Sequence, residues 1–217
     1  MIETRLALDD PANEPIAALC CSSLLLDPIV EYIGMLPILQ YAAVWYSPND
    51  AFVGSSQLYH MDAEDYRQVK VFILLDDVDE NTGPFTLIPS NQTKQIHGKL
   101  RRQWIVRRRG EKVTDEDIHR AAGCKEGIPM CGGVGTTAFV DTCNVYHFGS
   151  RPSTEISKPR KLLFLHFISP FSSGMPVLGR RARHPSIPEN YDADHASVRK
   201  QLFGLSHLSY PIRYGGS

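Results

Sequence analysis

Most hydrophobic segments of the chain are short and have the two-residue repeat of β-strands, in which successive side chains point to opposite faces. β-branched and aromatic residues dominate these segments, and clusters of Gly, Pro, Asn and Asp separate them. The longest of them ends in an acidic stretch and is followed, after Gly83-Pro84, by another strand-like run. The pattern predicts a mainly β chain with strands at residues 42–46, 69–75, 85–89, 136–141 and 161–168.

Helical periodicity is confined to a few segments. Apolar residues recur at three- and four-residue intervals from 14 to 26, which predicts a helix that Asp27-Pro28 ends, and a second helix continues to residue 36. We expect both helices to pack on the outside of the sheet. A Thr followed by acidic residues predicts a short helix at 114–122. Beyond residue 170 the chain is predicted to be a loop-rich tail with one helix at 196–203.

The composition limits the class of protein. A length of 217 residues suits one domain, with helical support at about 14–40, a barrel at about 41–170 and a tail at 171–217. The formal net charge is only −1, so no global field attracts the protein to nucleic acid or to an anionic membrane, and any such attraction must be local. The 5 Cys form no disulfide pattern, which favours a reducing cytoplasm. No signal peptide or uninterrupted membrane span is predicted, so we expect a soluble protein without membrane contact.

A candidate metal-binding pair directly precedes the strand at 69–75. In an extended segment, His60 and Asp62 point to the same side because they are two residues apart. One imidazole and one carboxylate can bind one ion together. A mononuclear Fe(II) site for oxygen chemistry needs two His and one carboxylate on one face, with the other positions open. The third ligand must therefore come from another part of the chain.

These residues resemble a known family. The order of His60-x-Asp62, the run VKVFILLDDVDENTGPF and the following IPSN are similar to the phytanoyl-CoA dioxygenase-like branch of the Fe(II)/2-oxoglutarate-dependent oxygenases. The resemblance extends from about residue 55 to 170, with a poorly matching middle at about 95–131. It implies a double-stranded β-helix, also called a jelly roll, that binds Fe(II) and 2-oxoglutarate at one mouth of the barrel and uses O2.

The resemblance also implies the remaining site residues. The distal metal ligand of the family occupies the context of His147, which closes a strand-like run, and an Arg follows at the start of the next strand, as Arg160 does here. Arg160 would pair with the far carboxylate of 2-oxoglutarate, and Arg151 is a competing candidate because the connection is long. His166 lies inside an apolar strand, which favours a core or supporting role. Asp62 occupies the position at which halogenating relatives have a small residue, so the resemblance implies oxidation of a C–H bond rather than halogenation.

Two further residues are candidates for cosubstrate binding. Lys70 lies on the same face as Phe72 and Leu74, and it either extends to water from an edge strand or reaches the cosubstrate or a site carboxylate. Gln57 resembles a cosubstrate-contacting amide of some family members. Simple alternation along the strand would turn Gln57 away from the metal side.

Residues 95–110 form a strongly basic segment that also contains Trp104. Basic residues next to an aromatic side chain can bind a polyanion. Acidic residues follow from Glu111 onward, and they favour a solvated, internally paired insertion over a dedicated polyanion site. Its place between predicted strands near the mouth suits a lid.

The leading hypothesis is an Fe(II)/2-oxoglutarate dioxygenase that hydroxylates or otherwise oxidises a C–H bond of a small organic substrate and releases succinate and CO2. One alternative is a cupin-like metal enzyme that uses the same ligands without a keto acid. Another is a non-catalytic jelly-roll binding module. Nucleic acid is not an expected partner, and a homo-oligomer is left open. The sequence does not identify the substrate.

Overall fold

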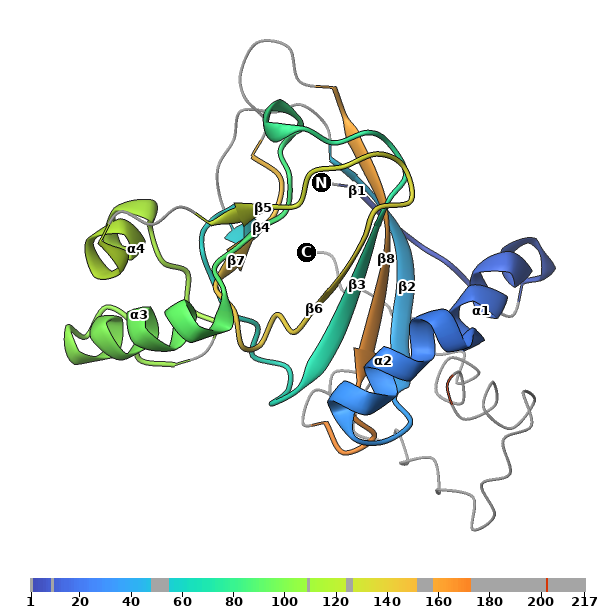
Figure 1. Ribbon diagram of the computed structural model, residues 1–217, viewed down its shortest axis with the longest axis horizontal. Helices are drawn as coiled ribbons and strands as arrows, with labels where there is room; N and C mark the ends of the chain where they lie inside the picture. Colours follow the sequence, from blue (N-terminus) through green and yellow to red (C-terminus); the bar gives the residue numbers. More distant parts are fainter. Residues whose placement is uncertain are drawn as a thin grey trace, which may run out of the picture.

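Two antiparallel sheets organise the protein (Figure 1). The computed structural model describes residues 2–8, 10–47, 55–108, 110–123, 127–151, 158–172 and 202. The larger sheet has five strands in the order β1-β2-β8-β3-β6, and the smaller has three in the order β5-β4-β7. The strands are β1 (Ile2–Arg5), β2 (Ile38–Ser47), β3 (Gln68–Leu74), β4 (Thr86–Leu87), β5 (Ile128–Pro129), β6 (Thr137–Val140), β7 (His147–Phe148) and β8 (Arg160–Ile168). The mainly β prediction is confirmed.

The inner faces of the two sheets meet in an aromatic core. β3 pairs with β8 on one side and with β6 on the other, so it is a central strand. Alternation along β3 and β8 turns Phe72 and Phe164 inward, where Phe72 stacks on Phe85 beside β4 at 4.4 Å between ring centroids. Trp45 of β2 stacks on Phe164 at 4.0 Å. The contact between Phe72 and Phe85 joins the larger sheet to the segment that leads into β4 of the smaller sheet.

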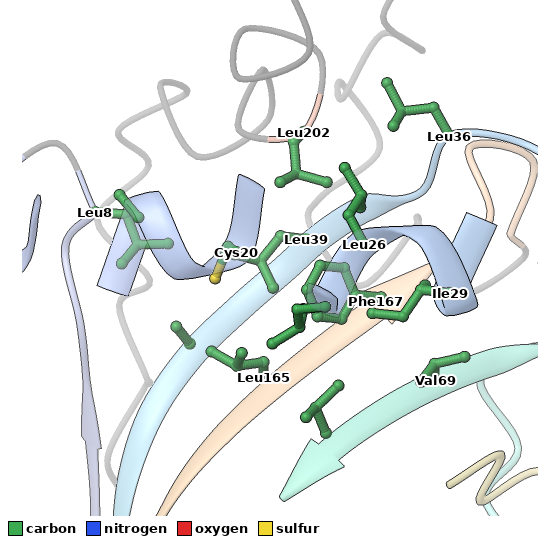
Figure 2. Close-up of a cluster of buried hydrophobic side chains, with 14 of the residues drawn as sticks. Leu8, Cys20, Leu26, Ile29, Leu36, Leu39, Val69, Leu165, Phe167 and Leu202 are labelled. Atoms are coloured by element: carbon green, nitrogen blue, oxygen red, sulfur yellow. The ribbon is translucent and has the colours of Figure 1, made fainter. Parts of the chain in front are cut away.

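The outer face of the larger sheet is covered by α1 (Glu14–Cys21) and α2 (Ser23–Ile33) (Figure 2). Their apolar side chains pack on the outward-facing residues of β2, β3 and β8, as predicted. The predicted boundary is wrong, because the helices break at Ser22 and Pro28 lies inside α2. Pro28 removes one intrahelical hydrogen bond, to the carbonyl of Leu24, but Leu24 is 82% exposed and its carbonyl can be hydrated. Buried residues on the opposite face hold the helix together.

The smaller sheet is covered on its outer side by α3 (Ser90–Arg102) and α4 (Asp115–Ala122). The predicted helix at 114–122 is confirmed, and Thr114 caps it by accepting a 3.2 Å hydrogen bond from the amide of Asp117. α3 was not predicted, because its sequence is dominated by polar and basic residues and only Thr93, Ile96 and Leu100 are buried. In Figure 1, α3 and α4 lie on the opposite side of the sheets from α1 and α2.

Short 3-10 helices complete the described connections, at Pro11–Asn13, Ser55–Gln57 and Glu80–Thr82. The last one links β3 to β4 and begins with a capping box at Asp79; Gly83 ends it with a positive φ of 68°, which a glycine adopts easily. The predicted helix at 196–203 falls outside the described residues except for Leu202, which packs on the α1–α2 cluster. Within the described ranges no single helix could cross a membrane by length and apolar content; only the bent pair Pro11–Cys21 and Ser23–Ile33 meets both criteria together.

Candidate metal centre

The side chains of His60, Asp62 and His147 converge between the two sheets. One ligand atom of each lies within 4.8 Å of the others. The backbone brings them together, because His60 and His147 form an antiparallel bridge with mutual N–H···O hydrogen bonds of 3.0 and 2.9 Å. The amide of Asp62 donates a 2.9 Å hydrogen bond to the carbonyl of Thr142 on the same connection. Residues far apart in the sequence therefore share one short ladder, and their side chains point to one place.

Both imidazoles present a free nitrogen to the same side. The Nδ1 of His60 lies 2.8 Å from the carbonyl of Leu58, and the Nδ1 of His147 lies 3.1 Å from the carbonyl of Val145. Carbonyls only accept, so each Nδ1 carries the proton and each Nε2 keeps its lone pair. The Nε2 atoms lie 3.7 and 3.8 Å from Oδ1 of Asp62, which leaves room for a cation bound at about 2.0–2.3 Å.

Burial keeps both imidazoles neutral. Desolvation lowers the pKa of His60, and it lowers the pKa of His147 to about 4 although the negative charge of Asp62 acts in the opposite direction. At neutral pH neither ring has to lose a proton before it binds a cation. The site is thus two neutral nitrogen donors and one carboxylate.

The second oxygen of the carboxylate is held by neighbouring side chains. Lys70 Nζ lies 2.5 Å from Oδ2 of Asp62, and Gln68 Nε2 donates to the same oxygen at 3.1 Å. Burial raises the pKa of Asp62, but the positive charge of Lys70 and hydrogen bonds from Lys70 and Thr142 act in the opposite direction and hold this pKa below its ordinary value. Of the two interpretations of Lys70, the one in which it reaches a site carboxylate is confirmed. The edge-strand interpretation is wrong because β3 is central.

Gln68 is a supporting residue that the sequence analysis missed. Its amide nitrogen also donates to Thr142 at 2.6 Å, and its carbonyl oxygen lies 2.7 Å from Nε2 of His166. Burial lowers the pKa of His166 well below its ordinary value, so a neutral ring that donates from Nε2 fixes the amide orientation. Alternation could have identified this residue, since Gln68 is two positions before Lys70 on the same face. His166 has the supporting role expected of it.

A cavity of about 170 Å³ opens from the three converging side chains. Its apolar walls include Trp45, Phe72 and Phe85, and its polar lining includes Lys70 and Arg160. The Arg160 side chain is unusual, because the residue is only 3% exposed and its buried Nε has no hydrogen-bond partner. No described residue forms an ion pair with this guanidinium, and burial lowers the pKa of Arg160 to about 10. A buried cation that lines a cavity and forms no ion pair with the described residues is suited to an anionic ligand.

The side chains of Arg151 and Gln57, the other candidates for cosubstrate binding, make contacts outside the cavity. Nη1 of Arg151 lies 2.7 Å from Oδ2 of Asp115, and its Cζ lies 3.6 Å from the ring centroid of Phe148. Its Nε donates to the carbonyl of Gln57. The amide nitrogen of Gln57 donates a 2.6 Å hydrogen bond to the carbonyl of Ser150. Arg151 therefore joins α4 to the segment that leads to His60, while Arg160 lines the cavity.

The remaining histidines are distant from the cluster or outside the described part of the chain. His97 lies 2.9 Å from the hydroxyl of Tyr146 through its Nδ1, and His119 is exposed on α4. His184, His195 and His207 lie outside the described residues.

Comparison with solved structures identifies the fold. EctD from S. alaskensis, solved with 2-oxoglutarate and 5-hydroxyectoine, matches with a TM-score of 0.55 and 19% identity over 77% of this chain and 56% of that one. EvdMO1 matches with a TM-score of 0.52 and 16% identity, covering 78% of this chain and 36% of that one. Apo HygX from Streptomyces hygroscopicus matches with a TM-score of 0.51 and 14% identity, covering 78% of this chain and 72% of that one.

These likenesses support the jelly-roll prediction, since the protein shares its two-sheet architecture with EctD and HygX. The chain spans 56% of the length of EctD, so it corresponds to part of that enzyme. No family model and no curated protein sequence matches the chain. At identities below one fifth, the structural likeness concerns the fold and leaves the chemistry to be argued from the site.

Proposed function

We propose that the protein is an Fe(II)- and 2-oxoglutarate-dependent dioxygenase that oxidises a C–H bond of a small organic substrate. The observation that carries the proposal is one cavity with a His–Asp–His cluster and the guanidinium of Arg160, which forms no ion pair with any described residue. The cluster suits a divalent cation, and the guanidinium suits a carboxylate. A keto acid with a second carboxylate can contact both.

The donor set fits Fe(II). His60, Asp62 and His147 would hold the ion through two imidazole nitrogens and Oδ1 of the carboxylate, a combination typical of non-haem Fe(II) sites with open positions facing the substrate. A structure of HygX has iron bound, and one of EctD contains 2-oxoglutarate, which supports the choice of metal and cosubstrate. When bound, Fe(II), 2-oxoglutarate and O2 together supply oxidative decarboxylation to succinate and CO2 and the oxidising power for the C–H bond.

The chain's own residues position these groups. Lys70 and Gln68 hold Oδ2 of Asp62, so the carboxylate presents Oδ1 to the ion and cannot rotate freely. Arg160 would donate paired hydrogen bonds to the distal carboxylate of 2-oxoglutarate. The aromatic walls make much of the cavity lining apolar, and an apolar surrounding strengthens these electrostatic interactions.

The type of oxidation follows from Asp62. A carboxylate at this position occupies a coordination site that an added halide would need, so we propose hydroxylation or a related oxidation of the substrate. Membership of the phytanoyl-CoA dioxygenase-like branch rests on the sequence motifs and is part of the proposal.

Succinate release from 2-oxoglutarate with Fe(II) and O2 tests the proposal. Even without the natural substrate, oxygenases of this kind are expected to turn over slowly, and His60→Ala should abolish this release. Unchanged release in the variant would contradict the assignment. Arg160→Leu separates the oxygenase from a cupin-like enzyme without a keto acid, because only the oxygenase should lose affinity for 2-oxoglutarate. Absence of Fe(II) and Mn(II) binding in calorimetry would favour the non-catalytic binding module.

A further inference from the structure

The C-terminal end of α3 forms a basic surface away from the metal centre. Seven Lys or Arg residues and no acidic residue occur from position 90 to position 110. Five of the exposed side chains around the end of the helix and the following turn, four Arg and one Trp, form a surface that we call the α3 tip. In Figure 1 the helices α3 and α4 lie at the edge of the molecule. The α3 tip consists of Arg101, Arg102, Trp104, Arg107 and Arg108.

Most of the charge at the α3 tip is not neutralised within the described part of the chain. Arg108 pairs with Glu111 at 3.5 Å, and Arg108 is 86% exposed there. Glu111 also accepts a 2.6 Å hydrogen bond from the backbone amide of Arg107. The side chains of Arg101, Arg102 and Arg107 have no ion pair with any described residue. The expectation of an internally paired insertion is therefore wrong for this end of the segment, since Glu116 and Asp117 of α4 pair with Arg120 and Asp115 pairs with Arg151.

Trp104 occupies a position at which a helix normally has glycine. The amide of Trp104 donates to the carbonyl of Arg101 at 3.1 Å, and the amide of Ile105 donates to the carbonyl of Leu100 at 3.0 Å. This pair of bonds is the Schellman motif, whose first residue beyond the cap is left-handed and is usually Gly. Trp104 has a φ of 60°, and it is the only non-glycine residue with a positive φ in the described ranges. A side chain with a Cβ is strained in that conformation.

The strain at Trp104 has no compensation in packing. The indole is 74% exposed, whereas the next residue, Ile105, packs against the α3–α4 core. A glycine at position 104 would form the same turn without strain and without presenting an apolar ring to water. A large aromatic side chain that is held outward at such a position indicates a surface that contacts a partner.

We propose that the α3 tip binds the surface of an anionic phospholipid membrane. Arginine side chains bind lipid phosphates, and an exposed indole enters the headgroup region, where one end of the ring is apolar and the N–H remains hydrated. Basic clusters of this size on an amphipathic helix are typical of such contacts. Single-stranded nucleic acid fits less well because it needs successive aromatic platforms, and Trp104 is the only large exposed aromatic on the described parts of α3, α4 and their connection. The contact revises the expectation of no membrane partner, which rested on the net charge and on the lack of a predicted signal peptide or membrane span. It is independent of the oxygenase proposal.

Flotation of the full chain with phosphatidylcholine vesicles, with and without phosphatidylserine, tests the contact. The wild-type protein should float only with the phosphatidylserine vesicles, and added salt should release it. The double variant Arg101→Gln/Arg102→Gln should bind about 25-fold more weakly, from roughly fivefold for each charge near the bilayer. Lys161→Gln removes an exposed charge on β8, outside the α3 tip, and should bind like the wild type.

Trp104→Gly separates binding from folding. Because the glycine relieves the strained φ, this variant should unfold at the same temperature as the wild type or higher, yet bind vesicles several-fold more weakly. The proposal is overturned if phosphatidylserine does not increase vesicle binding of the wild type or if Trp104→Gly binds vesicles as well as the wild type does. It is also overturned if Trp104→Gly unfolds at a lower temperature than the wild type. Binding of a single-stranded oligonucleotide without binding of vesicles would also overturn it, in favour of a nucleic-acid contact.

Discussion

Replacing Arg160 by methionine should stabilise the free protein and weaken the binding of 2-oxoglutarate. The guanidinium is 3% exposed and has no ion-pair partner among the described residues, and burial lowers its pKa from 12.5 to about 10. At neutral pH the group is charged in both the folded and the unfolded chain, because both pKa values are far above 7. The cost of burying the charge is therefore fully present there and would be relieved only above about pH 10.

The size of both effects follows from the burial of Arg160. A lowering of the pKa from 12.5 to about 10 corresponds to about 3 kcal/mol of unfavourable free energy in the folded state. Methionine fills similar space without a charge, so the free energy of unfolding of the variant should rise by up to that amount. Removing one partner of a buried charge pair costs roughly 2–5 kcal/mol, so the dissociation constant for 2-oxoglutarate should rise by about 30-fold or more.

Thermal unfolding with and without the ligand measures both effects in one assay. With Mn(II) present, 2-oxoglutarate at 100 times the wild-type dissociation constant should stabilise the wild type by about 2.7 kcal/mol, but Arg160→Met by about 0.9 kcal/mol or less. Arg151→Met is the matched control, because it removes an arginine that pairs with Asp115 rather than facing the cavity. Unchanged ligand stabilisation in Arg160→Met, or a loss restricted to Arg151→Met, would refute the assignment.

Further predictions concern the metal centre. Lys70→Met leaves the Asp62 carboxylate buried without its ammonium partner, so the variant should be less stable by about 3–5 kcal/mol in urea unfolding of the metal-free protein. Added Mn(II) should restore much of this loss. If it does not, Lys70 and the metal do not share the Asp62 carboxylate. His60→Ala should abolish stoichiometric Fe(II) or Mn(II) binding in calorimetry, and residual binding at wild-type affinity would exclude this ligand. Burial lowers the folded-state pKa of His147 to about 4 and also lowers that of His166. The free energy of unfolding of the metal-free protein should therefore be highest above about pH 6.5 and should decrease as the pH falls toward 4. A free energy of unfolding that does not change with pH in chemical denaturation would show that these rings are not buried as neutral groups.

Local patterns in the sequence predicted much of the fold and part of the site. Strand alternation placed His60 and Asp62 on one side, and the family resemblance pointed to His147 at the end of a strand-like run; the structure brings the three side chains together. The capping pattern at Thr114 predicted α4, because capping depends only on residues that are close in sequence. Such features need no knowledge of tertiary contacts.

The remaining features depend on contacts between distant segments. Lys70 had two open interpretations because its partner, Asp62, is identified only when β3 lies beside the His60 segment. The role of Gln68 requires the pairing of β3 with β8, which brings His166 to its amide. α3 was missed because its buried face is narrow, and α2 continues through Pro28 because packing of the opposite face outweighs one lost hydrogen bond.

Calorimetric titration of the metal-free protein, first with Mn(II) and then with 2-oxoglutarate, tests most directly whether the three converging side chains and Arg160 form one functional site. The proposal predicts one Mn(II) per chain, and 2-oxoglutarate binding only after the metal is bound. Absence of metal binding, or equal 2-oxoglutarate binding with and without the metal, would contradict it.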